Sequence, residues 1–432
     1  MSGAGERGAG ADPSGGAAGP RVPPALTAVD RLLLGQDAPA HPMVIRVRFR
    51  WDGPLDASLV GEAADRATAR HPMLRAVTDG RSWTPTDAPR PPAAPAGDVP
   101  FLDVGSAPGL RVSHHGAFTD FDFHHACCDG QGARQWLVDW LVISDALARG
   151  VAPDPPRLDA SRLALRGDLS HPPGVEPIGG AEGLANLRLT TRGRTARLRG
   201  RHAPRLDTVE LPPGETAAAR AAVKAAGLTL NDAGVLAAFA ALMECGDDPA
   251  LPRLSGGRLT VLNPVDLRRP ADLRMPAAGK VGFAYLRRTR AECGAGLRAS
   301  VLEQLRYVKD RYAGAEFVRG FAAIEGVPGA VRLLRLLGKF VPTCQFTCLG
   351  DATRGRRLGF RRNGAGDVLV GEARLASIAG FAPPGPGVPL SLSACETATS
   401  LTLTAWHTLG DGGAALLKRF AVSTASPPGG GG

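Results

Sequence analysis

Apolar residues recur along the chain with two alternating periods. From residue 45 to residue 51, apolar side chains alternate with arginines, which is the period-2 pattern of a half-exposed strand. A helical pattern follows, which begins after the N-cap candidate Asp56 and ends near Pro72. Two further strands are expected at Leu110–His114 and Phe118–Phe123. The first part of the chain is therefore expected to mix strands and helices.

A helix with one strongly apolar face is predicted next, and the second half of the chain repeats the alternation. This helix covers Gly132–Arg149, and we interpret Trp136 and Trp140 on its apolar face as core residues. Later helices are predicted at Glu215–Ala226, from Thr229 or Asn231 to Met243, at Leu297–Tyr312 and at Gly412–Phe420. Later strands are predicted at Leu259–Leu262, Val281–Leu286, Gln345–Leu349, Val368–Val370, Leu390–Ser393 and Leu401–Trp406. Two such sets predict an α/β (α+β) protein built from two lobes.

Four segments differ in composition from these lobes. Residues 1–22 and 425–432 are rich in Gly, Ala, Ser and Pro, so we expect two disordered tails. Residues 85–100 are rich in Pro and Ala, residues 164–204 contain many arginines with weak apolar periodicity, and neither segment resembles a core. The expected division is an N-terminal lobe at 23–185, a linker at 186–205 and a C-terminal lobe at 206–424.

The composition narrows the classes of partner. Of the 432 residues, 51 are Lys or Arg and 41 are Asp or Glu, which gives a formal net charge of +10. Aromatic residues make up only 5% and no five basic residues are consecutive, so nucleic acid is not the expected partner. The positive charge suits an acidic carrier protein or a phosphorylated cofactor arm.

The cysteines and the apolar runs exclude further classes. The seven cysteines are scattered without a C-x-x-C pair, so neither a disulfide framework nor a zinc site is expected. The first 25 residues lack a signal-peptide pattern, and the apolar run Ala233–Met243 is shorter than the ~20 residues that span a bilayer. For Phe317–Phe340, packing on a lobe or at a tunnel mouth is favoured over a membrane surface. We expect a soluble, cytoplasmic protein without a structural metal.

The most informative segment follows the strand at Phe118–Phe123. His124, His125, Asp129 and Gly130 form the pattern H-H-x-x-x-D-G, between the end of a strand and the start of a helix. With this composition, the four positions match by chance roughly 0.002 times per chain. The pair at residues 114–115 is an internal control, because neither an Asp nor a Gly follows it at the same offsets.

This pattern suits acyl transfer by direct attack. If the strand alternates to its end, His125 projects on the side of Phe121 and His124 on the other side. A neutral His125 in a partly apolar channel can accept a proton from an attacking amine or hydroxyl. Gly130 is expected to let the backbone turn sharply, so that its amide can stabilise an oxyanion. Asp129 is expected to form a structural ion pair with Arg268 rather than to carry a proton.

Other interpretations of the same residues are weaker. Cys127 and Cys128 fit small buried residues better than a thiol nucleophile. Adjacent histidines on a strand point to opposite faces, so His124, His125 and Asp129 are not expected to hold a metal. The sequence has no G-x-S-x-G, P-loop or dinucleotide-binding pattern, so esterase, kinase and dehydrogenase functions have no support.

The chain resembles the superfamily of condensation domains and chloramphenicol acetyltransferases, which are thioester-dependent acyltransferases. The match at His124–Gly130 is specific, and weaker matches follow the family's order between Leu26 and Val422. They are the helix Asp56–Arg75 with its R-H-P-x-L-R ending, Leu228–Asp232, Asn263–Arg269 and Phe346–Asp351. In the last of these, Thr347 and Cys348 replace the usual residues.

The resemblance implies two acetyltransferase-like lobes in a V-shaped pseudo-dimer with a tunnel at their interface. It implies His125 as the catalytic base, Asp129 with Arg268 as a structural ion pair, and His124 as motif support. The donor would be an acyl thioester on coenzyme A or on a phosphopantetheinyl carrier protein bound in trans, and no cofactor would be bound permanently. A small-molecule acceptor would come from the other face, and the chain is expected to act as a monomer.

Three functions follow from these expectations. The first is a free-standing condensation-type acyltransferase of specialised metabolism, which makes an amide or an ester. The second is a coenzyme A-dependent alcohol acyltransferase that makes lipid or wax-type esters. The third is a non-catalytic module that docks carrier proteins, although such a role does not require His125, Asp129 and Gly130. A long apolar channel would favour fatty acyl chains, and a short polar one would favour aminoacyl or aryl groups.

Overall fold

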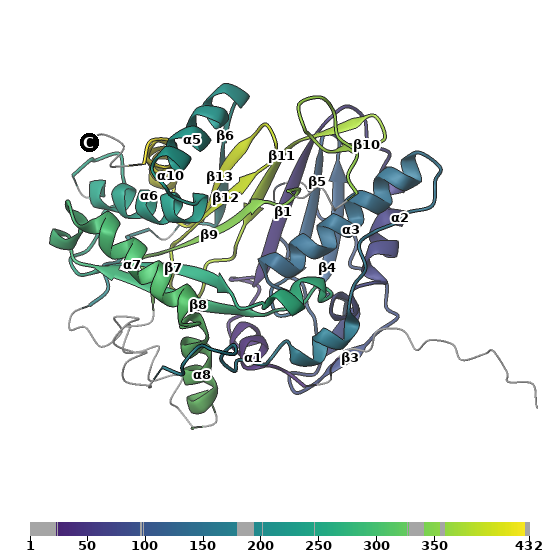
Figure 1. The fold of residues 1–432 in the computed structure, drawn as a ribbon, viewed down its shortest axis with the longest axis horizontal. Coiled ribbons are helices and arrows are strands. Elements are labelled where there is room, and N and C mark those ends of the chain that lie inside the picture. The colour runs from purple at the N-terminus through teal and green to yellow at the C-terminus, as the bar shows by residue number, and fades with distance from the viewer. Residues whose placement is uncertain are drawn as a thin grey trace, which may run out of the picture.

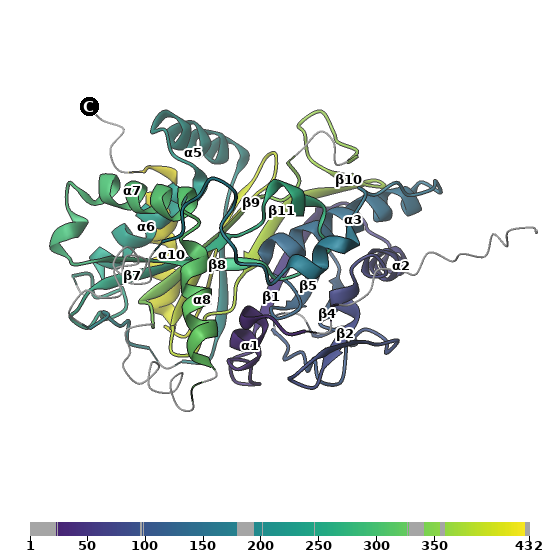
Figure 2. The same ribbon diagram turned by 60° about the horizontal axis from the view of Figure 1, so that its bottom comes forward.

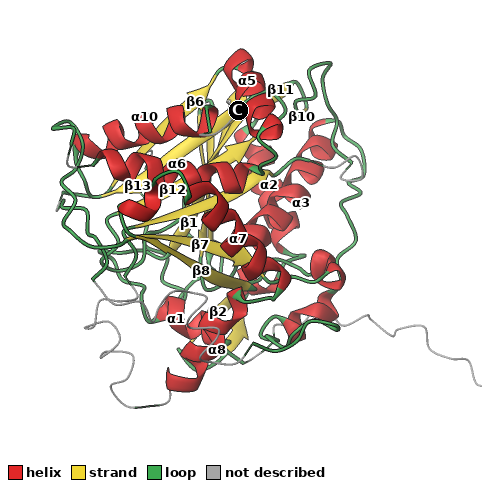
Figure 3. Ribbon diagram, turned by 60° about the vertical axis from the view of Figure 1, so that its left-hand side comes forward, coloured by secondary structure: helices red, strands yellow, loops and turns green. Residues whose placement is uncertain are grey.

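The computed structural model describes residues 23, 25–95, 97, 99–178, 194–200, 202–245, 247–325, 327, 341–354 and 359–427. Two mixed lobes lie side by side in Figure 1, the earlier part of the chain at the right and most of the later part at the left. Each lobe is a sheet with helices packed on it (Figure 3). The expected tail at 1–22, residues 428–432 of the expected tail at 425–432, and the linker residues 186–193 and 201 fall outside the described residues.

The elements of the first half are as follows: α1 (Ala28–Leu34), β1 (Val44–Asp52), α2 (Ala57–Thr68), η1 (Pro72–Arg75), β2 (Ala76–Thr78), β3 (Trp83–Pro85), β4 (Leu110–His115), β5 (Phe118–His124), α3 (Gly130–Ala148) and η2 (Ala160–Leu165). Those of the second half are β6 (Arg205–Leu211), α5 (Pro213–Ala225), α6 (Leu230–Glu244), β7 (Leu259–Asp266), η3 (Pro270–Arg274), β8 (Val281–Arg288), η4 (Ala291–Cys293), α7 (Leu297–Asp310), α8 (Gly314–Glu325), β9 (Cys344–Asp351), β10 (Leu369–Val370), β11 (Ala373–Phe381), β12 (Leu390–Glu396), β13 (Leu401–His407) and α10 (Asp411–Ala425).

The first sheet has the order β10-β11-β1-β5-β4 and packs against α3. Phe121 and Phe123 lie on one face of β5, where the ring centroid of Phe123 is 5.5 Å from that of Trp136 and Phe121 is 4.8 Å from Trp140. These edge-to-face contacts confirm the core role that the spacing of the two tryptophans predicts. The packing places the end of β5, and with it the histidine pair, beside the start of α3.

The second sheet has the order β6-β13-β12-β9-β7-β8. Strand β9 lies parallel to both β12 and β7, whereas β7 and β8 are antiparallel. Helix α6 is buried over most of its length, because Val235, Leu236 and Phe239 have no exposed area and pack in the core of this lobe. Helix α6 begins with a capping box at Thr229, which was one of its two predicted starts.

Strand β11 corrects the expected division into lobes. The C-terminal lobe was expected at 206–424, but β11 pairs antiparallel with β1 and therefore extends the first sheet. Figure 1 shows β10 and β11 in the right-hand lobe beside β1 and β5, in the colour of the late chain. The sequence of β11 was not predicted as a strand, because its Ala, Ser and Gly residues alternate weakly in polarity. The crossover joins the two lobes by backbone pairing.

The expectation of a half-exposed strand at residues 45–51 is wrong for its first arginine. Only 1% of Arg46 is exposed, because its guanidinium pairs with the buried carboxylate of Asp122 on β5, at 2.7 Å.

The Pro- and Ala-rich residues 85–100 also contribute to packing. The amide of Ala94 donates to the hydroxyl of Ser113 on β4, and Val99 packs against the cluster of Ala379, Phe381 and Trp406. This segment therefore covers part of the outer face of the first sheet.

Two other segments differ from expectation. Part of the expected linker, residues 194–199, pairs with residues 253–258, since the amide of Ala196 donates to the Arg258 carbonyl and that of Arg258 to the Arg194 carbonyl. The first part of the segment 317–340 belongs to α8, which packs on β8 through Phe317 and Phe283, and residues 328–340 fall outside the described chain. Among the described residues no single helix is both long enough and apolar enough to cross a membrane. Helices α5 and α6 together have that length and composition, but they are bent by 96° relative to each other.

Candidate active site

A cavity of about 820 Å³ lies between the two lobes. Its walls come from α1, β1 and the loop after β5 on one side and from β7, β8, α8, β9 and β12 on the other. Figure 2 shows α1 and α8 next to each other at the lower side of the junction. Most lining side chains are apolar, among them Leu33, Met43, Ile45, Val47, Leu262, Val281, Phe283, Phe317, Phe321 and Ile324. The cavity is therefore an interlobe chamber with largely apolar walls.

His125 lines this cavity from the loop that joins β5 to α3. Its backbone amide donates to the Met43 carbonyl at 2.7 Å, which extends the pairing of β5 with β1 by one residue. The ring atom Nδ1 is buried and has no hydrogen-bond partner among the described residues. Burial lowers the pKa of His125 below its ordinary range, so the ring is neutral near pH 7. A neutral imidazole at a cavity wall has the properties of a general base.

His124 faces away from the cavity wall. Its Nδ1 accepts from the amide of Ala126 at 3.2 Å, so Nε2 carries the proton and donates to the carboxylate of Asp37, also at 3.2 Å. The other oxygen of Asp37 accepts from the amide of Met43. His124 thus links the loop between α1 and β1 to the end of β5. The two histidines have different surroundings, as their predicted alternation requires.

Asp129 is the N-cap of α3 and uses both carboxylate oxygens. One oxygen accepts from the amide of Gly132 at 2.8 Å, and the other accepts from the Lys280 amide at 2.7 Å and from Arg268 Nη1 at 2.9 Å. Burial alone would raise the pKa of Asp129, but the charge of Arg268 and these hydrogen bonds lower it overall. An ionised carboxylate with these partners suits a structural role better than proton transfer.

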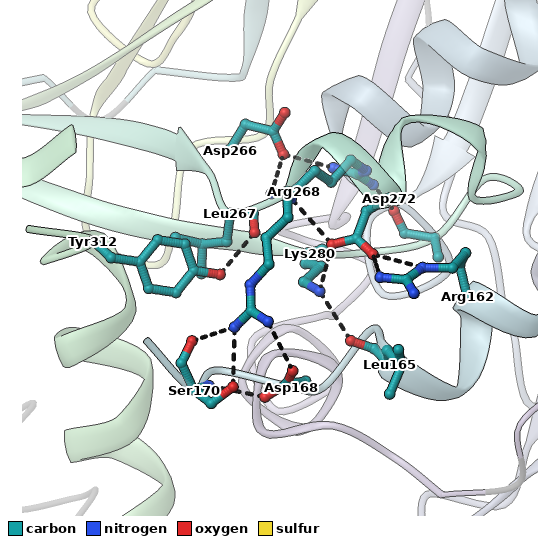
Figure 4. Close-up of polar contacts among 12 residues, drawn as sticks. Arg162, Leu165, Asp168, Ser170, Asp266, Leu267, Arg268, Asp272, Lys280 and Tyr312 are labelled. Atoms are coloured by element: carbon teal, nitrogen blue, oxygen red, sulfur yellow. Dashed lines mark hydrogen bonds and ion pairs between the residues drawn. The ribbon is translucent and has the colours of Figure 1, made fainter. Parts of the chain in front are cut away.

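Arg268 is brought to Asp129 from the second lobe, 139 residues away. Its guanidinium also contacts Asp266 at 3.0 Å and donates to the Ala278 carbonyl at 2.7 Å. A second buried ion pair lies beside it in Figure 4, where Lys280 Nζ is 2.8 Å from Asp272, and Asp272 also accepts from Arg162. Burial opposes ionisation of Asp272, but its bonds to Lys280 and Arg162 lower its pKa to about 2. Charged groups thus connect the lobes next to the motif.

Gly130 lines the cavity as the first residue of α3, but the expected sharp turn is absent. The residue begins a regular helix and does not have a positive φ. A Cβ at this position would meet only Leu349 Cδ1, at 3.8 Å. The glycine therefore leaves open space between the helix start and β9. Its amide is one of the first N–H groups of α3, which lack carbonyl partners within the helix.

The neighbouring cysteines are buried without exposed area. Burial raises the pKa of the Cys127 and Cys128 thiols, so both remain protonated near pH 7. Their burial agrees with the interpretation that they fill space. Among the described residues all seven cysteines are free thiols.

Two residues that were not predicted from the sequence hold the motif against the second lobe. His71 is completely buried, accepts from the amide of Ala277 at 2.8 Å and donates to Asp139 on α3 at 3.2 Å. Gly132 permits close approach of the loop that contains Ala277 and Ala278, because a Cβ at position 132 would lie 2.6 Å from the Ala278 carbonyl oxygen. The R-H-P-x-L-R ending and the unusual glycine in the first helical turn were the available signals.

No protein-family model and no curated protein matches the chain. Solved structures do match it. The first condensation domain of the CDA synthetase is 17% identical with a TM-score of 0.60, and the alignment covers 95% of this chain and 97% of that one. Polyketide synthase associated protein 5 from Mycobacterium tuberculosis is also 17% identical, with a TM-score of 0.62 and coverage of 95% and 100%.

Two further matches differ in activity or ligand. The epimerization domain from the third module of tyrocidine synthetase B is 14% identical, with a TM-score of 0.62 and coverage of 94% and 97%. A variant of the starter condensation domain of rhizomide synthetase, in complex with C8-CoA and Leu-SNAC, is 14% identical, with a TM-score of 0.60 and coverage of 93% of each chain. This protein has the fold of the condensation-domain superfamily, in its mixed two-lobe form. An epimerization domain has a similar fold, so the fold alone does not define the reaction.

Proposed function

We propose that this chain is a condensation-type acyltransferase that joins an acyl thioester to an amine or hydroxyl acceptor. The observation that carries the proposal is the neutral ring of His125, unpartnered at Nδ1, on the wall of an interlobe cavity. In this proposal the enzyme is monomeric and cytoplasmic. Its donor is held on coenzyme A or on a carrier protein in trans.

The proposed reaction is a direct attack without a covalent enzyme intermediate. The acceptor nitrogen or oxygen attacks the thioester carbonyl while His125 takes the acceptor's proton. The tetrahedral oxyanion then collapses, the carbon–sulfur bond breaks, and the leaving thiolate takes the proton from the imidazolium. The amide of Gly130, at the positive end of α3, supports the oxyanion. Asp129 and Arg268 keep the loop that carries His125 in place.

The apolar walls support the second candidate function for the same site. The first lobe contributes Leu33, Met43, Ile45 and Val47 to the lining of the cavity, and the second lobe contributes Phe283 and Phe317. Such walls favour an apolar acyl or alkyl chain over a charged aminoacyl group. A coenzyme A-dependent alcohol acyltransferase that makes lipid or wax-type esters is therefore the alternative, and it uses the same base.

The experiment that tests the proposal is product formation measured by mass spectrometry. Purified protein is incubated with a panel of acyl-coenzyme A and acyl-carrier thioesters together with pooled amines and alcohols. His125→Ala is compared with His115→Ala, a control from the second histidine pair, which does not line the cavity. We expect an acylated product whose rate of formation falls at least ~100-fold in His125→Ala and changes little in His115→Ala.

Each other outcome has a defined meaning. Equal rates in wild type and His125→Ala would show that His125 is not the base. An ester with long-chain donors alone would select the alternative. If neither protein forms a product with any donor, binding of carrier proteins becomes the better account of the site, and acyl transfer is rejected.

A further inference from the structure

One strand in each sheet ends in a buried histidine with the same pair of hydrogen bonds. His124 is the last residue of β5 and His407 is the last residue of β13, and neither has exposed area. In each ring Nδ1 accepts from the backbone amide two residues later, at 3.2 Å. Nε2 therefore carries the proton and donates to a carboxylate, that of Asp37 at 3.2 Å or that of Asp207 at 2.7 Å. We call this arrangement the His–Asp unit.

The backbone after each His–Asp unit also follows one pattern. His125 donates its amide to the Met43 carbonyl at 2.7 Å, and Thr408 donates its amide to the Pro389 carbonyl at 3.0 Å. Met43 and Pro389 are the residues that precede β1 and β12. Among the described residues that line the interlobe cavity are His125 and Met43, but neither Thr408 nor Pro389. The unit therefore ends a strand in both lobes and lies beside a candidate base in only one of them.

The two carboxylates differ in what their second oxygen contacts. Oδ1 of Asp37 accepts from the backbone amide of Met43 at 2.8 Å. The corresponding oxygen of Asp207 lies 3.7 Å from the guanidinium of Arg205, at the start of β6. The side chain of Asp37 is 10% exposed, against 20% for Asp207. Only Asp37 thus binds a histidine and the neighbouring strand at the same time.

Both contacts of Asp37 lead to His125 by short paths. Met43 receives the carboxylate at its amide and accepts from the His125 amide at its carbonyl. His124, which holds the other carboxylate oxygen, is bonded covalently to His125. The backbone of His125 is therefore restrained from both sides by one carboxylate. Such restraint matters to a general base, because a misplacement of about 1 Å can slow a reaction roughly 100-fold.

We propose that Asp37 is a positioning residue, which fixes the place of the base His125 through His124 and Met43. The inference rests on the proposed function, since it concerns the base of the same reaction. Asp37 itself does not line the cavity, so its effect on the reaction passes through these neighbours. Its loss should lower kcat and leave KM nearly unchanged, because the apolar walls that bind the substrates stay in place.

The test compares Asp37→Asn with Asp207→Asn, the same substitution in the other His–Asp unit. Each variant replaces one acceptor oxygen by an NH₂ group of similar size, which cannot accept a hydrogen bond. Both should lower the midpoint of thermal unfolding by a similar amount. Only Asp37→Asn should lower kcat, by about 10- to 100-fold, with KM within roughly twofold of wild type. Wild-type kcat in Asp37→Asn, or equal losses of kcat in the two variants, would overturn the inference.

A second measurement needs no turnover. Hydrogen exchange of the His125 amide, followed residue by residue, reports its bond to the Met43 carbonyl. We expect exchange at least ~10-fold faster in Asp37→Asn than in wild type, and an unchanged rate in Asp207→Asn. An unchanged rate in both variants would overturn the inference.

The two measurements separate the positioning role from the proposed function. Faster exchange in Asp37→Asn, in a protein whose wild type transfers no acyl group, would reject the proposed function and keep the role of Asp37. If Asp37→Asn does not fold, Asp37→Ser takes its place, because it puts no NH₂ group against the two N–H donors. Wild-type exchange and wild-type kcat in Asp37→Ser would overturn the inference.

Discussion

At the scale of single residues, the properties of His125 depend on what surrounds its ring. Burial in the interlobe cavity lowers its pKa, while the carboxylate of Asp129 opposes this effect. His124, one residue earlier, uses both ring nitrogens in hydrogen bonds and therefore has a structural role. Adjacent residues of the same type thus have different roles because the strand ends between them.

The lowered pKa of His125 predicts the pH dependence of the reaction. The base must be neutral to accept a proton, so kcat/KM should rise with pH through the pKa of the free enzyme and then remain constant. Because burial lowers that pKa, the midpoint should lie below about 6.5, the ordinary value for histidine. A pH profile of kcat/KM for wild type checks this. A midpoint above 7 would contradict the neutral-base assignment.

At the scale of elements, the start of α3 is positioned by close contact with a loop of the second lobe. Asp129 caps the helix, and the Ala278 carbonyl lies where a side chain at position 132 would be. The helix macrodipole and the free amides of its first turn are thereby directed at the cavity. The element contributes to the site only because the loop at residues 277–280 packs against it.

Substitution of this glycine tests the contact. Gly132→Ala places a Cβ 2.6 Å from the Ala278 carbonyl oxygen and should destabilise the fold by about 1–3 kcal/mol through overpacking. Gly61→Ala on α2 is the matched control, since a Cβ there meets nothing within 4 Å, and it should stabilise by roughly 0.5–1 kcal/mol through helix propensity. Thermal unfolding of both variants measures the difference, and equal midpoints would argue against the close contact.

At the scale of the whole molecule, the two lobes are joined by buried polar contacts next to the motif and by backbone pairing of β11. Asp129 and Arg268 form an ion pair from opposite lobes with side chains 5% and 6% exposed. His71 adds a neutral hydrogen bond to Ala277 across the same junction. The cavity exists because these contacts fix the two sheets relative to each other.

The ion pair predicts a stability change that depends on both partners. Arg268→Met leaves the carboxylate of Asp129 buried without its charge partner and should lower the free energy of unfolding by about 3–5 kcal/mol. The double variant with Asp129→Asn should lose less free energy of unfolding than the two single variants lose in sum. Urea unfolding at pH 7 measures the cycle, and strict additivity would contradict the pairing.

The same pair predicts how stability depends on pH. Because the folded pKa of Asp129 is lowered, its contribution is present above the ordinary carboxyl pKa of about 3.9 and is lost as pH falls below it. Asp129→Asn removes this titrating group, so its stability should decrease less on acidification than that of wild type. Urea unfolding at pH 5 and pH 3 makes the comparison.

The sequence by itself determined the local features of this protein. The H-H-x-x-x-D-G pattern located the histidines, the helix cap and the glycine, because these features depend on residues close together in the chain. The two-lobe α/β class and most helices followed from hydrophobic periodicity. The candidate pair of Asp129 and Arg268 was also identified, and the structure brings the two residues together.

Only the tertiary structure decided which faces are covered and which distant segments meet. Periodicity shows that residues alternate but not what lies on each side, so the burial of Arg46 with Asp122 and the placement of β11 beside β1 were not predictable. The contact of His71 with Ala277 likewise joins residues that are far apart in the chain. Such contacts depend on the packing of whole elements, which local sequence does not encode.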